Sequence, residues 1–350
     1  MPKRAFKRAV TLSLLGAVSY LVVARGGLAD VRASLSRLSP ADLGLASLVP
    51  LAAVAASVRR WQLLLAHEGL RLPFRRLLAS FLRGRFVGAF TPSTAGLDLY
   101  RLVDVGRRTG DRAASGRAIL LEKLLGLVAL ALVTLALLPV GLARFFGTGG
   151  LLGALGLGAV AATGLALLGR PALLRAMAAR LPRRLRSRAH GLVDLLSTRR
   201  LPRGDLARAL GFGVASHLAT AAVFVATGRA LGVAVDPMSL LVVGNAIVLA
   251  TLLPISVGGI GVREGTAVAL LAAVGVGPAQ AALVALLGYL AMQPPAILGG
   301  LLMLWWSEDP RPATPAAITL AGLTPVAEAP LLAQPAITPT ASSTSARLPM

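Results

Sequence analysis

The sequence predicts an all-α polytopic membrane protein with about six full membrane spans and two re-entrant helical hairpins that form an inverted repeat. Three observations predict this fold: the apolar composition, the gathering of positive charge into two blocks, and a short motif that occurs twice. Of the 350 residues, 56% are hydrophobic and only 14% are charged, and the mean hydropathy is +0.76. A soluble domain carries about 25% charged residues, so the composition indicates a chain that crosses a membrane several times.

The net charge of +22 comes almost entirely from arginine, because lysine occurs only at Lys3, Lys7 and Lys123. Two strongly basic blocks, residues 59–117 and 170–208, alternate with apolar segments. The positive-inside rule places both blocks on the cytoplasmic side. Charge in loops between apolar spans indicates attraction to an anionic lipid surface, so no nucleic-acid partner is expected. The chain has no cysteine, which excludes disulfides and thiolate chemistry.

Six apolar segments are candidate membrane spans. They are residues 9–24, 41–58, 119–139, 151–168, 211–231 and 279–306. The first could be a signal peptide, but it is long for one and no small-residue cleavage site follows, so we expect a membrane helix. Pro294 and Pro295 are expected to kink the last span. Residues 1–307 then form a transmembrane domain and residues 308–350 a disordered tail rich in Pro, Ala and Thr, with both termini on the cytoplasmic side of the inner cell membrane.

A ten-residue motif occurs twice, at residues 92–101 and 254–263. Aligned without a gap, its copies share a proline, a hydroxyl residue, a glycine and an arginine, which are Pro92 and Pro254, Thr94 and Ser256, Gly96 and Gly258, and Arg101 and Arg263. The match continues at the same offset into Leu-Leu-Gly at residues 124–126 and 286–288. A helix breaker, a hydroxyl and flexible glycine between apolar segments are typical of broken helices that line a polar site within a membrane. Each copy therefore predicts the turn of a re-entrant hairpin.

The two hairpins are expected to point in opposite directions. Three predicted spans, an odd number, lie between the two motifs, so the first hairpin opens to the cytoplasm and the second to the outside. The repeat halves cover about residues 59–139 and 229–306, with the basic cytoplasmic linker at residues 170–208 between them. Inverted hairpins that meet near the midplane are the architecture of transporters that expose one site to alternate sides.

Arg101 and Arg263 are the leading candidates for a binding site, because each follows its turn by the same distance. A guanidinium at the mouth of a hairpin can hold the phosphate of a lipid head group through two parallel hydrogen bonds. Hydroxyls and backbone amides nearby are expected to assist, at Ser93, Thr94, Gly96, Ser256, Gly258 and Gly259. In the alternative, structural interpretation, Arg101 pairs with Asp98 or Glu122. Arg263 would then pair with Glu264.

Two further ionisable residues lie inside predicted spans, where an unpaired charge is costly. Glu122 is expected to pair with Arg101, and alternatively to carry a coupling proton. Lys123, beside it, is expected to point away toward the membrane surface. His217 could relay protons or be a neutral packing residue. No histidine in the chain has acidic neighbours at metal-ligand spacing, so neither a metal nor a cofactor is predicted.

Four segments resemble a known family. They are Arg60-Trp61-Gln62-Leu63-Leu64, FTPSTAGLDLYR at residues 90–101, LLEKLLGL at 120–127 and LLPISVGGIGVREG at 252–265. Together they resemble the lysylphosphatidylglycerol synthase transmembrane-region family, also called flippase-like domain proteins, over residues 10–306. The family usually has Gly-Gly-Asp where this chain has Gly96-Leu97-Asp98. The resemblance marks as functional positions Asp98, Arg101, Glu122, Pro254, Gly258, Gly259, Arg263 and Glu264.

In the full-length synthase, the resemblance implies that such a membrane domain translocates aminoacylated phosphatidylglycerol made by a soluble C-terminal domain. Here only residues 308–350 follow the membrane part, so aminoacyl transfer is expected to be absent and the protein is not expected to be an enzyme. The prediction is a protein that translocates an anionic or isoprenoid-linked lipid between leaflets, with Arg101 and Arg263 gripping the phosphate from the two sides.

Two alternatives stay open. One is a membrane-embedded lipid head-group transferase that uses Asp98 or Glu122 as its base. The other is a non-transporting scaffold that recruits envelope-assembly enzymes through residues 170–208. The sequence contains no phosphate-binding loop of the G-x-x-x-x-G-K-[ST] type and no G-x-S-x-G or H-E-x-x-H motif, so ATP-driven pumping and these hydrolase chemistries lack support.

Overall fold

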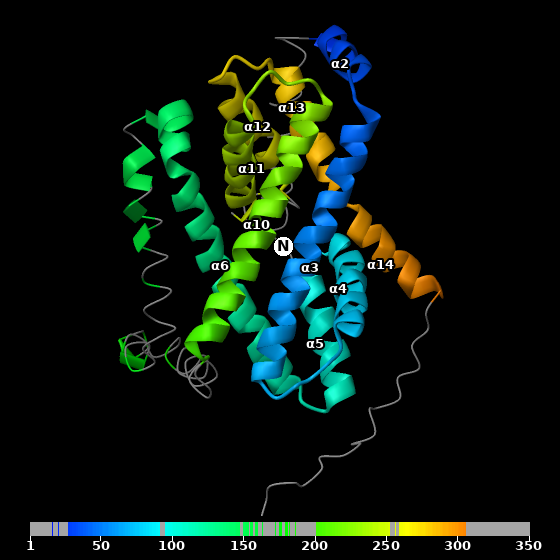
Figure 1. Ribbon diagram of the computed structural model, residues 1–350, viewed down its shortest axis with the longest axis vertical. Coiled ribbons are helices and arrows are strands. Elements are labelled where there is room, and N and C mark those ends of the chain that lie inside the picture. Colours follow the sequence, from blue (N-terminus) through cyan, green and yellow to red (C-terminus); the bar gives the residue numbers. More distant parts are fainter. Residues whose placement is uncertain are drawn as a thin grey trace, which may run out of the picture. The chain divides into compact units, whose positions relative to one another are not determined.

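The computed structural model describes residues 27–91, 95–147, 201–252, 256 and 259–305, together with isolated positions among residues 1–26 and 148–200. Throughout this part of the chain the regular structure is helical, as the sequence predicts (Figure 1). The elements are α2 (Gly27–Ser36), α3 (Pro40–His67), α4 (Phe74–Ala89), α5 (Ala95–Thr109), α6 (Arg112–Gly141), the π-helical turn η1 (Leu142–Phe146), α10 (Arg203–Ala230), α11 (Pro237–Leu252), α12 (Val262–Ala272), α13 (Pro278–Ala291) and α14 (Pro294–Trp305).

Four helical stretches are long and apolar enough to cross a membrane. They are Pro40–His67, Arg112–Phe146, Arg203–Ala230 and Pro278–Trp305. These stretches contain four of the six predicted spans, which are thereby confirmed as candidate membrane helices by length and composition. The predicted spans at residues 9–24 and 151–168 lie mostly outside the described residues and stay predictions.

Two helices extend beyond the apolar segments that predicted them. α3 continues past Val58 to His67, and α10 begins at Arg203, inside the predicted linker of residues 170–208. The predicted boundaries are wrong at these two ends because arginine favours helix almost as well as leucine does. A run of charge therefore marks where a helix leaves the apolar layer, while the helix itself goes on. The remainder of the linker lies mostly outside the described residues.

The last candidate span is broken into two helices. α13 ends at Ala291 and α14 begins at Pro294, where two successive prolines lack the backbone N–H that would continue the helix. The predicted kink is therefore a complete interruption. α14 packs closely against α4, and a Cβ atom at Gly299 would clash with the backbone carbonyl of Leu82.

Each copy of the repeated motif connects two helices that pack on each other, and the first copy continues into α5 as far as Arg101. α4 packs against α5 across the first motif, and α11 packs against α12 across the second. In Figure 1, α4 and α5 lie in the lower half of the molecule, whereas α11 and α12 lie in the upper half. The predicted re-entrant hairpins stay predictions, because five of their turn residues lie outside the described part of the chain: Pro92, Ser93, Thr94, Pro254 and Gly258.

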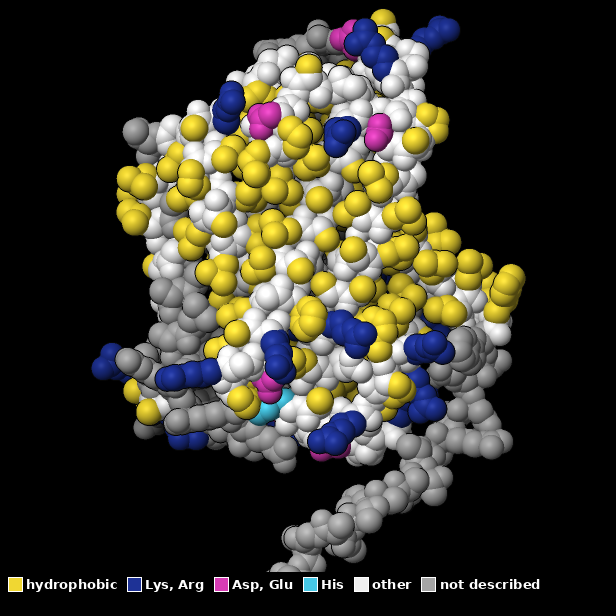
Figure 2. Space-filling model, in the orientation of Figure 1, with side chains coloured by type: hydrophobic (Ala, Val, Ile, Leu, Met, Phe, Trp, Pro, Cys, Tyr) yellow, Lys and Arg dark blue, Asp and Glu magenta, His cyan; other side chains and the backbone are white. Residues whose placement is uncertain are grey.

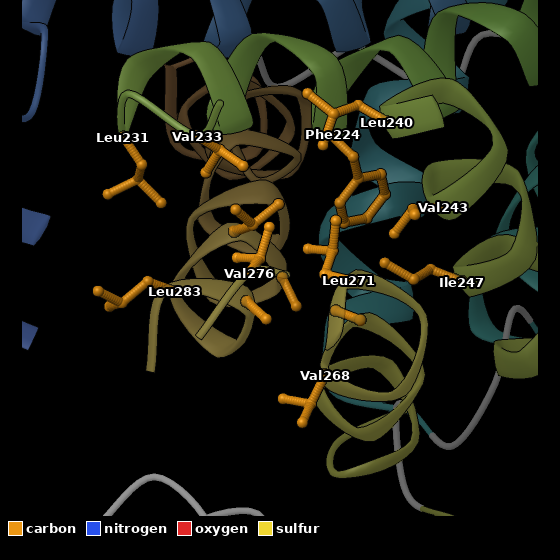
Figure 3. Close-up of a cluster of buried hydrophobic side chains, with 14 residues drawn as sticks. Phe224, Leu231, Val233, Leu240, Val243, Ile247, Val268, Leu271, Val276 and Leu283 are labelled. Carbon is orange, nitrogen blue, oxygen red and sulfur yellow. The ribbon is translucent and has the colours of Figure 1, made fainter. Parts of the chain in front are cut away.

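Two apolar clusters hold these helices together. In one, Phe224 of α10 points toward Leu271 of α12 and Val243 of α11 (Figure 3). The other joins α3 to α4 and α6, with the fully buried Trp61 and Leu125 among its members. Outside these clusters, hydrophobic side chains cover the middle of the face drawn in Figure 2, and most charged side chains lie toward its upper and lower ends. This distribution fits a molecule whose middle contacts lipid chains.

Candidate functional site

Arg101 belongs to a buried ion-pair network between α5 and α6. Its Nη1 donates to Oε2 of Glu122 at 2.7 Å, and its Nη2 donates to Oδ1 of Asp98 at 2.7 Å. The side chain of Arg101 is 3% exposed and that of Glu122 is 6% exposed. Asp98 lies one turn before Arg101 on α5, whereas Glu122 comes from α6, so the network also joins the two helices. Both partners that the structural interpretation offered for Arg101, Asp98 and Glu122, are therefore bound to it.

A second arginine, Arg60 of α3, approaches the other oxygen of the same carboxylate. Its Nη2 lies 3.4 Å from Oε1 of Glu122. Two glycines make room for the guanidinium, because a Cβ atom would lie 3.4 Å from Nη1 at Gly126 and 2.9 Å from it at Gly213. Nε and Nη1 of Arg60 make no hydrogen bond within the described part of the chain. Glu122 therefore compensates two buried arginines, one from α3 and one from α5.

Arg60 belongs to the first basic block, residues 59–117, and its functional position was not predicted from the sequence. The structure leaves Arg60 only 7% exposed. The physical reason is the continuation of α3, which carries Arg60 and Trp61 into the packing between helices. The sequence signal that could have found it is the Arg60-Trp61-Gln62-Leu63-Leu64 segment, one of the four that carry the family resemblance.

Two aromatic rings cover the faces of the Arg101 guanidinium. Its Cζ lies 4.7 Å from the ring centroid of Trp61 and 5.0 Å from that of Phe81. Rings on the faces and carboxylates at the edges satisfy both the charge and the planar shape of the group.

Lys123 completes the network and corrects a prediction. It was expected to point away from Glu122 toward the membrane surface, but its Nζ lies 2.6 Å from Oδ2 of Asp98. We call Arg60, Asp98, Arg101, Glu122 and Lys123 the Arg101 cluster. The Arg101 cluster thus brings three basic side chains together with two carboxylates.

His217 of α10 lies beside this cluster. Its Nε2 is 3.0 Å from the backbone carbonyl oxygen of Gly126. Because a carbonyl only accepts hydrogen bonds, this contact requires that Nε2 carry the proton and donate it. The bond joins α10 to α6, as expected of a packing residue.

Arg263, the counterpart of Arg101 in the second motif, lies beside a carboxylate and an aromatic ring. Its side chain is 8% exposed, and its Nη1 lies 3.8 Å from Oε1 of Glu264. The other oxygen of Glu264 accepts a 2.7 Å hydrogen bond from the backbone N–H of Gly261 and so caps the first turn of α12. The Arg263 guanidinium lies 4.2 Å from the ring centroid of Tyr289 on α13. We call Arg263, Glu264 and Tyr289 the Arg263 site.

The structure also describes four further residues of the two motifs. Gly259 has a positive φ of +77°, and a Cβ atom there would lie 3.3 Å from Nη2 of Arg263. Gly96 is buried, and its N–H donates to Oγ1 of Thr91 at 3.2 Å. Leu97, where the family has glycine, lies within α5, a conformation that leucine favours. Oγ of Ser256 is buried and makes no hydrogen bond within the described part of the chain.

Long apolar helices, a helical pair at each motif and buried arginines beside carboxylates define the class of the protein. It is a multi-pass helical membrane protein with a charged interior. Its family is also clear: residues 8–300 match the model of the lysylphosphatidylglycerol synthase TM region, and the chain belongs to this family. Comparison with curated proteins finds no match. The family is associated with phospholipid modification and flipping.

Proposed function

We propose that the protein translocates an anionic or isoprenoid-linked lipid between the leaflets of the membrane. Arg101 would hold the lipid phosphate when the site faces one side, and Arg263 would hold it when the site faces the other. The observation that carries the proposal is that both arginines are buried, at 2% and 7% exposure, at the same position of a motif that occurs twice. Charges buried inside membrane helices are costly and usually functional.

The electrostatics of the Arg101 cluster support phosphate as the ligand. Two buried guanidiniums, of Arg60 and Arg101, share the single carboxylate of Glu122, and Nε of Arg101 makes no hydrogen bond among the described residues. A phosphate offers two oxygens to one guanidinium, in the same geometry as the carboxylate that it would displace. Glu122 is then the group that competes with the lipid, and its protonation would favour release of Arg101 to the phosphate.

The arrangement of the two helical pairs supports alternating access. We infer that α4 and α5 form a re-entrant hairpin that opens to the cytoplasm, and that α11 and α12 form one that opens outward. Their location in opposite halves of Figure 1 agrees with this inverted relation. A site between inverted hairpins can be exposed to one leaflet at a time by a rocking movement of one hairpin pair against the other. In this orientation both termini are cytoplasmic.

Reconstitution into liposomes tests the proposal. Fluorescently labelled phosphatidylglycerol and a labelled polyisoprenyl phosphate serve as probes, and an impermeant quencher reports the fraction in the outer leaflet. The Arg263→Ala variant should lose translocation by at least about tenfold, as expected from loss of a charge-assisted contact. Arg107→Ala is the matched control, because Arg107 is exposed on α5. Transport by Arg263→Ala at the wild-type rate would overturn the mechanism.

The alternatives predict other outcomes. If the protein is a head-group transferase, a deletion strain should lack one lipid species, which lipid mass spectrometry would detect. The purified protein should then convert lipid without moving it between leaflets. A scaffold would retain an envelope-assembly enzyme on purification and show no lipid phenotype. Either result, together with absent translocation by the wild-type protein, would replace the transport proposal.

A further inference from the structure

A partly buried arginine lies outside both sites. Arg85 of α4 borders a cavity of about 80 Å³ between α3, α4, α10 and the break that separates α13 from α14. The cavity is polar on one wall, where it is lined by the hydroxyl residues Ser57, Ser216 and Thr220. Ser216 lies at the middle of α10, a candidate membrane span, so the cavity lies deep within the apolar layer.

Arg85 differs from Arg101 and Arg263 in having no carboxylate beside it. The residues that line the cavity include no Asp or Glu in the described part of the chain. The one polar contact of Arg85 there is a 3.3 Å hydrogen bond from its Nη2 to the carbonyl oxygen of Met292. The helix break removes the usual backbone donor to this carbonyl oxygen, because the N–H of Ala296 donates to the carbonyl oxygen of Gln293 instead. Arg85 is partly buried, and a cation whose protein partner is neutral is stabilised when an anion joins it.

The cavity has the size and the hydrogen-bonding groups for one oxyanion. At about 30 Å³ for each water, 80 Å³ holds roughly three waters, a volume that a compact oxyanion such as a phosphate group can replace. Ser216 donates to Ala53 O, so Ser57 is the donor in the 2.8 Å bond between the two serine hydroxyls. These hydroxyl hydrogens can rotate toward an anion, because a hydrogen bond to a charged acceptor is roughly twice as strong as a neutral one.

The cavity also adjoins both arginine sites. Phe81 lines it and stacks on Arg101 at 5.0 Å. Met292 lines it and follows α13, whose Tyr289 stacks on Arg263 at 4.2 Å. A ligand passing between the Arg101 cluster and the Arg263 site would therefore meet this cavity on the way.

We propose that the cavity at Arg85 is a third anion-binding site, which receives the phosphate of the lipid between Arg101 and Arg263. The inference rests on the proposed translocation for the source of the phosphate. Arg85 exchanges its bond to Met292 O for two hydrogen bonds to the phosphate, and Ser57 and Thr220 add hydroxyl donors. The ligand class is a phosphomonoester or phosphodiester oxyanion, carried by a lipid or free in solution.

The absence of cysteine from the chain allows a direct test, since one introduced thiol is then unique. Thr220→Cys puts a thiol in the cavity wall, and its rate of modification by a small methanethiosulfonate reagent reports occupancy. Leu218→Cys is the control, because Leu218 lies on the same helix and is itself 37% exposed. Each variant is measured in nanodiscs of phosphatidylcholine alone, in nanodiscs of phosphatidylcholine with phosphatidylglycerol, and in phosphatidylcholine with millimolar inorganic phosphate.

Phosphatidylglycerol should slow modification of Thr220→Cys by about tenfold and leave Leu218→Cys unchanged. Adding Arg85→Gln should abolish this protection, and adding Arg107→Gln, an exposed arginine, should preserve it. If Arg85→Gln does not fold, Arg85→Lys replaces it and should weaken protection, because lysine lacks the planar pair of donors. Protection that survives the Arg85 variants, or no protection by either probe, would overturn the site.

Three outcomes separate the site from transport. Protection by inorganic phosphate alone would retain the anion site and remove its lipid source. Arg85-dependent protection by phosphatidylglycerol in a protein that fails to translocate would support the site and contradict the proposed function. Translocation without Arg85-dependent protection would support the proposed function and contradict the site.

Discussion

Arg101 and Glu122 form a 2.7 Å ion pair between α5 and α6, with both side chains more than nine-tenths buried. The same carboxylate lies 3.4 Å from Arg60, so one glutamate compensates two arginines from different helices. Removing one partner of a buried pair leaves an uncompensated charge, whereas removing both can be nearly neutral. Comparing single and double variants can therefore separate the contribution of the Arg101 cluster to stability from its contribution to transport.

Glu122→Gln should destabilise the protein by about 3 kcal/mol or more, because it leaves Arg60 and Arg101 short of a buried negative charge. The measurement is chemical unfolding in detergent, followed by circular dichroism. Asp30→Asn, at an exposed aspartate of α2, is the control and should change stability little. An unchanged unfolding midpoint for Glu122→Gln would mean that Glu122 is already protonated in the folded protein.

A double-mutant cycle should separate stability from transport. Combining Arg101→Gln with Glu122→Gln should cost less than the sum of the two single changes, by about 1 to 3 kcal/mol, since the two side chains are in direct contact. The double variant should still fail to translocate labelled phosphatidylglycerol, because the phosphate-binding guanidinium is gone. Recovery of transport along with stability would assign Arg101 a purely structural role.

Two glycines on α10 should respond to alanine with opposite signs. A Cβ atom at Gly213 would lie 2.9 Å from Nη1 of Arg60 and 2.7 Å from Cβ of Ala129, so Gly213→Ala should cost about 1 to 3 kcal/mol. Gly211 is exposed with nothing within 4 Å of such an atom, so Gly211→Ala should gain about 0.5 to 1 kcal/mol from helix propensity. Thermal unfolding of both variants under one condition provides the comparison. Equal effects would contradict the close approach of Arg60 to α10.

Gly259 combines two constraints that a matched glycine separates. Gly259 and Gly275 both have positive φ, +77° and +82°, so either alanine variant should lose about 1 kcal/mol to backbone strain. At Gly259 the new Cβ atom would also lie 2.8 Å from Cγ2 of Thr251 and 3.3 Å from Nη2 of Arg263, whereas Gly275 has open space. Gly259→Ala should therefore lose more stability and also reduce translocation. If Gly275→Ala impairs translocation equally, the effect comes from strain alone and not from Arg263.

Much of the fold follows from local sequence. Apolar stretches predicted the spans that correspond to α3, α6, α10 and the α13–α14 pair. Two successive prolines predicted the interruption between α13 and α14. The boundaries at residues 58 and 211 were wrong, because helix propensity carries a helix past the point where its side chains turn basic.

The candidate site was only partly predictable. The pairing of Arg101 with Asp98 could be proposed from spacing, since three residues along a helix bring side chains together. The pairing with Glu122 of α6 could be proposed because an unpaired charge inside a span is costly. Lys123 was misassigned because its orientation depends on how α5 packs on α6. Arg60 and Arg85 were not predicted as site residues, because no local pattern indicates which distant helices pack around them.

The sequence by itself determined that the chain is helical, apolar and multi-pass, and it identified a repeated motif that ends in arginine. These properties are local, because they depend on hydropathy and backbone chemistry along a short segment. Only the tertiary structure decided which groups lie beside the buried and partly buried arginines: Glu122 beside Arg60 and Arg101, Glu264 beside Arg263, and a polar cavity beside Arg85. The physical reason is that the energy of a buried charge depends on partners from other helices, and these are brought together only by packing.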